Sequence, residues 1–130
     1  MINIPVRSDV RGVLHFAQEP EQIPFAVRRI FYLHHLVPGT SRGGHAHRGQ
    51  HQFLMMVAGS AQVVIDNGQM RDAIVLSDPG TALYCPPMLW LELGEFSPDA
   101  VCLVLTSGVY NEADYIRDTA EFRRLAAQVG

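Results

Sequence analysis

Short apolar runs separated by turn residues make up most of the chain. Each run has five to nine residues, which suits a β-strand better than a helix. The Gly, Pro, Asn and Asp residues between the runs favour tight turns. The predicted strands are residues 12–16, 28–36, 52–59, 60–66, 71–76, 81–85, 89–93 and 100–107. Many brief strands at close spacing predict an all-β fold, an antiparallel sandwich or barrel.

The C-terminal segment departs from this pattern. Residues 118–129, DTAEFRRLAAQV, carry apolar side chains at helical spacing. Asp118, followed three residues later by Glu121, is typical of a helix N-terminus. One short helix is therefore predicted to pack against the barrel.

Length, composition and charge limit the range of functions. A chain of 130 residues with 48% hydrophobic residues predicts a single domain spanning residues 1–130. A net charge of −3 argues against nucleic acid or an anionic membrane as partner. The sequence shows neither a membrane-spanning apolar run nor a secretory signal, so we expect a cytoplasmic protein. Cys85 and Cys102 lie in apolar stretches and are expected to be reduced core residues.

Three histidines and two glutamines fall within residues 45–52. Side chains at positions i and i+2 of a strand share a face, so His45 and His47 should point the same way and Ala46 the other way. A turn at residues 48–50 would then bring Gln52, at the start of the next strand, beside them. The sequence predicts two imidazoles that face one cavity.

The spacing of this region resembles the first cupin motif, which would span residues 39–59. Gln52 occupies the position where metal-binding cupins usually carry glutamate. A later Gly-x5-Pro turn at residues 80–86 keeps the spacing of the second motif, but Leu91 stands near the expected histidine. Because two of four expected ligands are missing, we predict no metal and no other cofactor.

The chain also resembles the small nucleotide-sugar 3,4-ketoisomerases, which act on dTDP-4-keto-6-deoxyglucose in deoxysugar synthesis. The resemblance rests on IPFAVRRIFYL, RGGHAHRGQHQFLMMVAGSAQVVIDNG, LYCPPMLW and SGVYNEADYIRDTAEF, and it runs from about Arg11 to Phe122. It implies a cupin (RmlC-like) jelly roll that needs no metal and takes a dTDP-linked keto sugar. It also implies a homodimer whose N-terminal strands cross between subunits.

The expected chemistry moves a ketone from carbon 4 to carbon 3 of the sugar through an enediol. The enzyme must remove the proton alpha to the carbonyl and return a proton to the neighbouring carbon. Histidine suits this work because its pKa lies near neutrality, and two adjacent imidazoles disfavour being charged together. We expect His47 to be the main proton carrier and His45 its partner at the sugar oxygens. Gln52 is expected to donate a hydrogen bond to one of those oxygens.

Further substrate-binding residues follow from placement and from the resemblance. Arginine suits a diphosphate, and Arg42 lies next to the histidine strand, whereas Arg29 shares its strand face with Phe31 and Leu33. Arg11 resembles part of an N-terminal turn that varies between family subtypes, and here it favours the axial product at carbon 4. The remaining candidates are Tyr32 and His34, which fall in a tyrosine-rich motif of the family, and Trp90, on which a nucleotide base could stack.

Several alternatives remain open from the sequence. A metal-dependent cupin enzyme, such as a dioxygenase or isomerase, would have to recruit a further ligand such as His51, which more readily fits a hairpin residue. A non-catalytic sugar-binding cupin has the same fold. A 3,5-epimerase would use a His–Asp dyad, for which the sequence shows no candidate. His34 and His35 are expected on opposite strand faces, and Tyr110 and Tyr115 at either the dimer interface or the cavity wall.

Overall fold

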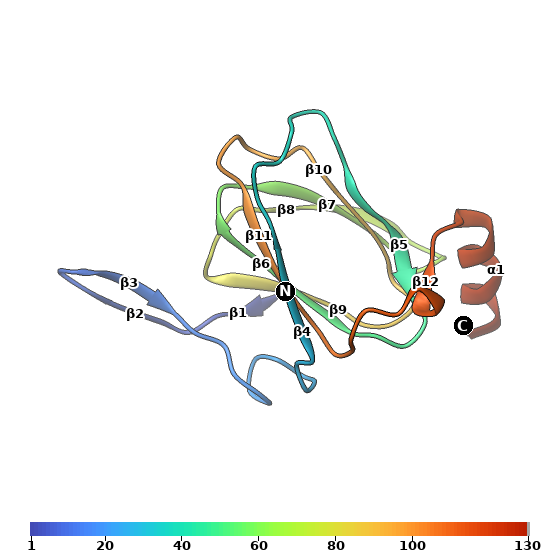
Figure 1. The fold of residues 1–130 in the computed structure, drawn as a ribbon, viewed down its shortest axis with the longest axis horizontal. Coiled ribbons are helices and arrows are strands. Elements are labelled where there is room, and N and C mark those ends of the chain that lie inside the picture. Colours follow the sequence, from blue (N-terminus) through green and yellow to red (C-terminus); the bar gives the residue numbers. More distant parts are fainter. Residues whose placement is uncertain (130) are drawn as a thin grey trace.

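The computed structural model describes residues 1–129 and contains two five-stranded antiparallel sheets packed face to face (Figure 1). The first sheet has the order β1-β9-β6-β11-β4 and the second the order β12-β5-β10-β7-β8. A separate hairpin, β2-β3, forms a third, two-stranded sheet. The predicted all-β cupin-like architecture with one C-terminal helix, α1 (Thr119–Val129), is confirmed.

All eight predicted strands are present, with ends that differ from the prediction by at most three residues. They are β3 (Gly12–His15), β4 (Arg29–Leu33), β6 (Gln52–Ala58), β7 (Ala61–Asp66), β8 (Arg71–Leu76), β9 (Thr81–Cys85), β10 (Trp90–Gly94) and β11 (Val101–Thr106). The histidine segment forms β5 (Arg42–His47), extended as expected. The apolar pattern did not reveal β1 (Ile2–Asn3), β2 (Val6–Asp9), β12 (Tyr115–Ile116) or the 3-10 turn η1 (Glu112–Asp114). These elements are too short or too polar to show a period.

The main core lies between the two large sheets. Alternate residues of both sheets meet there, among them Leu54, Val63, Leu93 and Val104. Cys85 and Cys102 are both free and buried in this core, as expected. Burial raises the pKa of the Cys85 thiol to about 12 and that of Cys102 to about 11, so both stay protonated and inert.

Helix α1 packs on the outside of the second sheet, behind the histidine strand (Figure 1). Its Phe122 is almost fully buried and contacts the indole of Trp90, with ring centroids 5.5 Å apart. Ala46 and Ile116 complete this second core. Asp118 caps the helix by accepting a hydrogen bond from the backbone N–H of Ala120. Glu121 forms an ion pair with Arg48 at 2.8 Å.

The hairpin of β2 and β3 extends away from the barrel (Figure 1). Val10, Val13 and Leu14 in this hairpin are all more than half exposed. Arg11, at the turn, pairs with the carboxylate of Asp9 at 2.7 Å. A two-stranded hairpin with exposed apolar side chains is marginally stable by itself. No helix among residues 1–129 is long and apolar enough to span a bilayer.

Candidate active site

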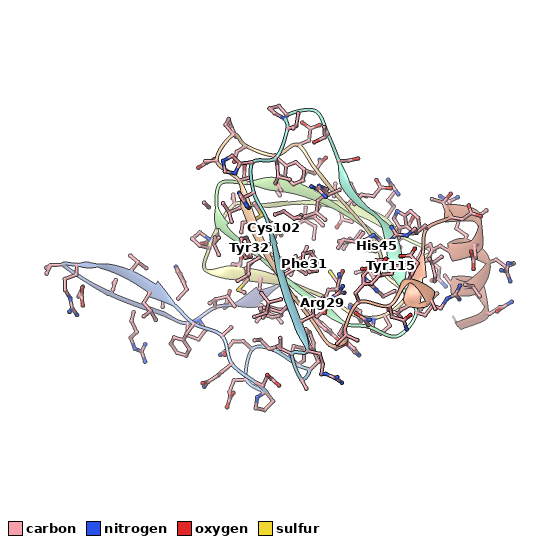
Figure 2. The ribbon with its side chains drawn as sticks, viewed as in Figure 1. Arg29, Phe31, Tyr32, His45, Cys102 and Tyr115 are labelled. Atoms are coloured by element: carbon pink, nitrogen blue, oxygen red, sulfur yellow. The ribbon has the colours of Figure 1, made fainter. Side chains whose placement is uncertain are left out.

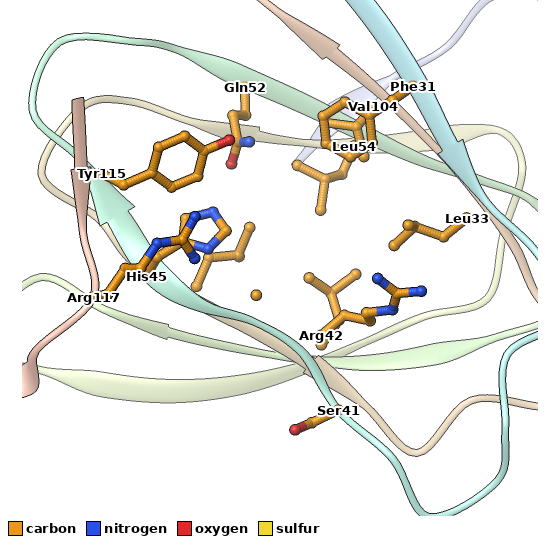
Figure 3. Close-up of a pocket in the computed structure, with 13 residues that line it drawn as sticks. Phe31, Leu33, Ser41, Arg42, His45, Gln52, Leu54, Val104, Tyr115 and Arg117 are labelled. Atoms are coloured by element: carbon orange, nitrogen blue, oxygen red, sulfur yellow. The ribbon is translucent and has the colours of Figure 1, made fainter. Parts of the chain in front are cut away.

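A cavity of about 370 Å³ opens between the two large sheets (Figure 3). Its apolar lining comes mainly from Phe31 and Leu33 of β4 and from side chains of β6, β10 and β11. Its polar lining consists of Ser41, Arg42, His45, Gln52, Tyr115 and Arg117. An apolar pocket with a few convergent polar groups is the usual form of a small-molecule site.

Strand β5 places His45 and His47 on one face and turns Ala46 toward helix α1, as the sequence predicted. The two imidazole rings are perpendicular, with centroids 5.1 Å apart. Gly43 permits the close pairing of β5 with β10, since a Cβ at this positive-φ residue would lie 2.7 Å from the carbonyl oxygen of Leu91. The two histidines differ in environment, because His45 lines the cavity and His47 is only 4% exposed.

Tyr115 holds both imidazoles in place from the neighbouring strand β12. In the β12–β5 pairing it lies opposite His47, and its ring is 4.8 Å from that of His45 and 4.5 Å from that of His47. Figure 2 shows the side chains of His45 and Tyr115 next to each other at the end of the barrel near α1. The sequence had left Tyr115 open between dimer interface and cavity wall, and the structure places it in the cavity wall.

His47 has an acidic partner. Its Nδ1 lies 2.8 Å from Oδ2 of Asp114, which immediately precedes β12. The expectation that the chain lacks a His–Asp dyad is therefore wrong. The two residues are 67 positions apart in the sequence, and only the pairing of β12 with β5 brings them together.

The charge state of the two histidines follows from burial. Desolvation, together with the neighbouring His47, lowers the pKa of His45 to about 4. Desolvation also lowers the pKa of His47, although the hydrogen bond and the charge of Asp114 act in the opposite direction. Both shifts favour the neutral imidazole, so His45 presents a neutral ring to the cavity at neutral pH. The sequence predicted His47 as the main proton carrier, whereas the histidine that lines the cavity is His45.

Two arginines flank the cavity. Figure 3 shows Arg117 beside His45 and Tyr115, and Arg42 toward the other end, near Leu33. Arg117 lies over the ring of Tyr115 and donates two hydrogen bonds to Glu112, at 2.7 and 3.0 Å. This pairing is the main reason why the pKa of the exposed Glu112 falls to about 2. The buried amide of Gln52 lines the cavity as predicted.

Strand β4 separates the sequence candidates that it carries. Phe31 and Leu33 point into the cavity, whereas Tyr32 lies on the opposite face. His34, just beyond the end of β4, borders with Tyr32 a shallow hollow beside residues 98–101. Arg29 shares the inner parity of Phe31, as expected, but its guanidinium is engaged with Thr106 and Gln50. None of Arg29, Tyr32 and His34 borders the cavity described here. Successive residues of a strand point to opposite faces, which is why Tyr32 faces away from the cavity that Phe31 and Leu33 line.

Two further candidates lie away from the cavity. Trp90 is buried beneath helix α1, where its indole N–H donates to Glu92, so no nucleotide base can reach it within this chain. The expectation of a stacking surface at Trp90 is therefore wrong, because the helix covers the indole. Arg11 is 87% exposed at the tip of the protruding hairpin, remote from the cavity of its own chain.

His34, His35 and His51 do not line the cavity. His34 and His35 lie beyond the end of β4 with adjacent rings, so the expected opposite-face arrangement is wrong. The backbone turns there, and His35 has a φ of 53°. His51 is turned away from His45 and hydrogen-bonds to the hydroxyl of Tyr84 at 2.7 Å, consistent with a hairpin residue. Among residues 1–129, no three His, Cys, Asp or Glu side chains gather as a metal site would require.

Asp114 and Arg117 were not predicted as site residues from the sequence. Both belong to a segment of mixed polarity after the last long strand, which shows neither strand nor helix periodicity. The only signal was that ADYIR formed part of the family resemblance. Their function depends on a two-residue strand that pairs with β5 far along the chain.

Comparison with known proteins matches residues 1–127 to the family model FdtA: WxcM-like, C-terminal. The chain belongs to this family. The resemblance to the sugar 3,4-ketoisomerases is thereby confirmed, and with it the enzyme class, an isomerase of nucleotide-linked keto sugars.

Three relatives support the assignment along the whole chain. The TDP-4-oxo-6-deoxy-alpha-D-glucose-3,4-oxoisomerase of Aneurinibacillus thermoaerophilus is 36% identical over 99% of this chain and 93% of the relative. The crystal structure of a 3,4-ketoisomerase from Helicobacter canadensis is 37% identical, with a TM-score of 0.93 over 97% of this chain and 95% of that one. A sugar 3,4-ketoisomerase from Thermoanaerobacterium thermosaccharolyticum, solved in complex with TDP, is 31% identical, with a TM-score of 0.95 over 98% and 93%.

Proposed function

We propose that this protein converts dTDP-4-keto-6-deoxyglucose into the corresponding 3-keto sugar, with His45 as the base that moves the carbon-bound proton. The observation that carries the assignment is the position of His45. Among residues 1–129 it is the one imidazole that lines the cavity, and its surroundings keep it neutral. The named substrate of the Aneurinibacillus relative and the TDP bound to the Thermoanaerobacterium enzyme support the choice of substrate.

The reaction needs one proton to move between carbons and another between oxygens. His45 takes the proton from carbon 3, and the electrons of that C–H bond form the enediolate as the carbonyl at carbon 4 becomes an oxyanion. Protonation of that oxygen gives the enediol. Loss of the proton from the oxygen on carbon 3 then restores a carbonyl there, while carbon 4 takes a proton from His45. The base returns to its starting state, so no redox partner is required.

The polar lining of the cavity suits the other parts of the substrate. Gln52 and Tyr115 present an amide and a phenol near His45, and both can hydrogen-bond to sugar oxygens without a change in charge. Arg42, toward the end of the cavity away from His45, provides a cation for the diphosphate, and Arg117 adds a positive charge beside His45. Arg42 and Gln52 were predicted from the sequence as substrate-binding residues, and Tyr115 and Arg117 are further candidates that line the same cavity.

The test is incubation of purified protein with dTDP-4-keto-6-deoxyglucose in deuterated water, followed by NMR. We expect the 3-keto isomer to form with deuterium at carbon 4 and, through the reverse reaction, at carbon 3. The configuration at carbon 4 reports whether the product is axial, as Arg11 suggested. Binding without any label would contradict the proposal and indicate a sugar-binding cupin.

One observation favours a second candidate reaction. The pairing of His47 with Asp114 is the feature that the sequence argument associated with 3,5-epimerases. An epimerase would place deuterium at carbon 5 as well as carbon 3. The same NMR spectra therefore distinguish the two reactions, and label at carbon 5 without a 3-keto product would favour the epimerase.

We also propose that the working enzyme is a homodimer in which the β2-β3 hairpins cross to the neighbouring subunit. The hairpin carries exposed valines and a leucine and pairs with no other strand in the described chain. An apolar groove of about 370 Å³ on the outer face of the first sheet, lined partly by Met55, Val57 and Leu103, offers a surface that a second copy can cover. In such a dimer, Arg11 would be carried toward the partner.

A cytoplasmic location completes the proposal. Both cysteines are free, as is usual for proteins of a reducing compartment.

A further inference from the structure

The hydrogen bond between His47 and Asp114 belongs to a rigid local arrangement. Oδ1 of Asp114 accepts from the backbone N–H of Gly49 at 2.8 Å, and Oδ2 accepts from that of Gln50 at 3.3 Å as well as from His47. The backbone carbonyl of Asp114 accepts from Arg48 N–H at 2.8 Å. Four contacts thus tie Asp114 to His47 and to the turn that follows it, and the carboxylate cannot rotate without breaking several of them.

The opposite side of the His47 ring is different. Its Nε2 is buried and forms no hydrogen bond with any of residues 1–129. Nearly all buried polar atoms in proteins are hydrogen-bonded, so an exception of this kind marks a position that a ligand, a water molecule or a catalytic step uses. A carboxylate can only accept a hydrogen bond, which requires that Nδ1 of His47 carry the proton. Nε2 of the neutral ring is then a free acceptor on the side away from Asp114.

We infer that Asp114 is a positioning residue of the isomerase, which fixes His47 as the Nδ1–H tautomer and holds its ring at a right angle to that of His45. It acts through His47 and does not line the cavity itself. The consequence is that His47 keeps Nε2 as its hydrogen-bond acceptor, on a ring that contacts both His45 and Tyr115. A carboxylate that orients an imidazole in this way contributes to catalysis through tautomer and geometry and does not take up the proton itself.

This inference rests on the proposed function for its catalytic readout, but the tautomer can be measured independently. In protein labelled with ¹⁵N at histidine, long-range ¹H–¹⁵N spectra at neutral pH distinguish the two neutral tautomers. We expect His47 to show a protonated Nδ1 and an unprotonated Nε2. Finding the Nε2–H tautomer in the unaltered protein would overturn the inference. Finding the Nδ1–H tautomer in a protein without isomerase activity would instead leave Asp114 in place and remove the proposed function.

The substitution Asp114→Asn keeps the size of the side chain and removes the carboxylate. We expect the Nδ1–H population of His47 to fall and kcat to drop by about tenfold or more, with KM changed much less, because His47 loses its orientation. The matched control is Glu121→Gln. It removes the ion pair between helix α1 and Arg48, which lies in the same turn, but Glu121 makes no contact with His47. That control should keep kcat within about twofold, since exposed ion pairs contribute little. Unchanged kcat in folded Asp114→Asn protein would contradict the role, and if the variant does not fold, the tautomer in the unaltered protein decides.

Discussion

His45 shows how one residue acquires a function from its surroundings. An exposed histidine would be partly protonated at neutral pH, whereas burial and the nearby His47 bring the pKa of His45 to about 4. The ring is therefore a neutral base throughout the physiological range, at the cost of lower basicity. Leu91, which pairs with His45 across the sheet, contributes to this dry environment from the position where metal-binding cupins would carry a ligand.

The lowered pKa of His45 predicts the acid side of the pH profile. Because only the neutral ring accepts a proton, kcat/KM should fall when His45 becomes protonated. The fall should occur well below pH ~6.5, the value for an ordinary histidine. His47, Arg117 and Glu112 also act on this titration, and of these Glu112 alone raises the pKa of His45. The measurement is kcat/KM from about pH 4.5 to 8.

A control distinguishes the protonation of His45 from general acid denaturation of the protein. His45→Asn should abolish detectable turnover at every pH while the circular dichroism spectrum and TDP binding persist. An acid limb centred at or above pH ~6.5 in the unaltered enzyme would mean that His45 is not the buried base described here.

At the level of elements, the C-terminal segment supplies one wall of the site and also supports it from behind. Strand β12 brings Tyr115 against both imidazoles, and helix α1 covers the back of β5, where Ala46 lies between the two histidines. Phe122 attaches the helix to β5, since it packs in the same buried cluster as Ala46 and Trp90. The helix is therefore part of the structure that keeps β5 in place.

The substitution Phe122→Ala should destabilise the protein by about 3–5 kcal/mol, the usual effect of removing a buried aromatic side chain. Activity should fall with it, because β5 loses its support. The measurement is urea unfolding followed by fluorescence, together with kcat in the absence of urea. Arg123→Ala, one position further along the same helix and on its exposed side, serves as control and should change stability by less than about 0.5 kcal/mol. Equal stability of the two variants would show that the helix does not contribute to the core.

For the whole molecule, the protruding hairpin is the feature that a single chain does not explain. Its two strands leave Val13 and Leu14 largely exposed, and it contacts no other sheet of the described chain through hydrogen bonds. A second copy would bury these side chains and give the hairpin a partner. The proposed dimer therefore accounts for a structure that would otherwise be unfavourable in water.

The substitution Val13→Asp places a charge on this surface and should convert the dimer into monomers, because burying an unpaired carboxylate at an interface is costly. Light scattering coupled to size-exclusion chromatography measures the result. Val75→Asp is the matched control. Val75 is 64% exposed, close to the 66% of Val13, but it lies on β8, the edge strand of the second five-stranded sheet. Dimers in both variants, or a monomeric unaltered protein, would refute the proposed interface.

Much of the fold and part of the site followed from local patterns. Alternation and turn residues located the long strands, and the spacing of His45 and His47 placed both on one strand face. The same rule predicted the parity of Arg29 with Phe31, but it did not show which face of β4 meets the cavity. Tyr32 and His34, predicted as substrate contacts from a family motif, border a different hollow, and Trp90, predicted as a stacking surface, is covered by helix α1.

The sequence by itself determined the properties that depend on neighbours along the chain, namely the strands, the helix with its Asp118 cap, and the shared face of the two histidines. The tertiary structure decided which histidine faces the cavity, that Asp114 reaches His47, and that Tyr115 and Arg117 close the site. These features depend on the pairing of β12 with β5 across more than sixty residues. A two-residue strand carries no periodic signal, and its place is set by packing and hydrogen bonding in three dimensions.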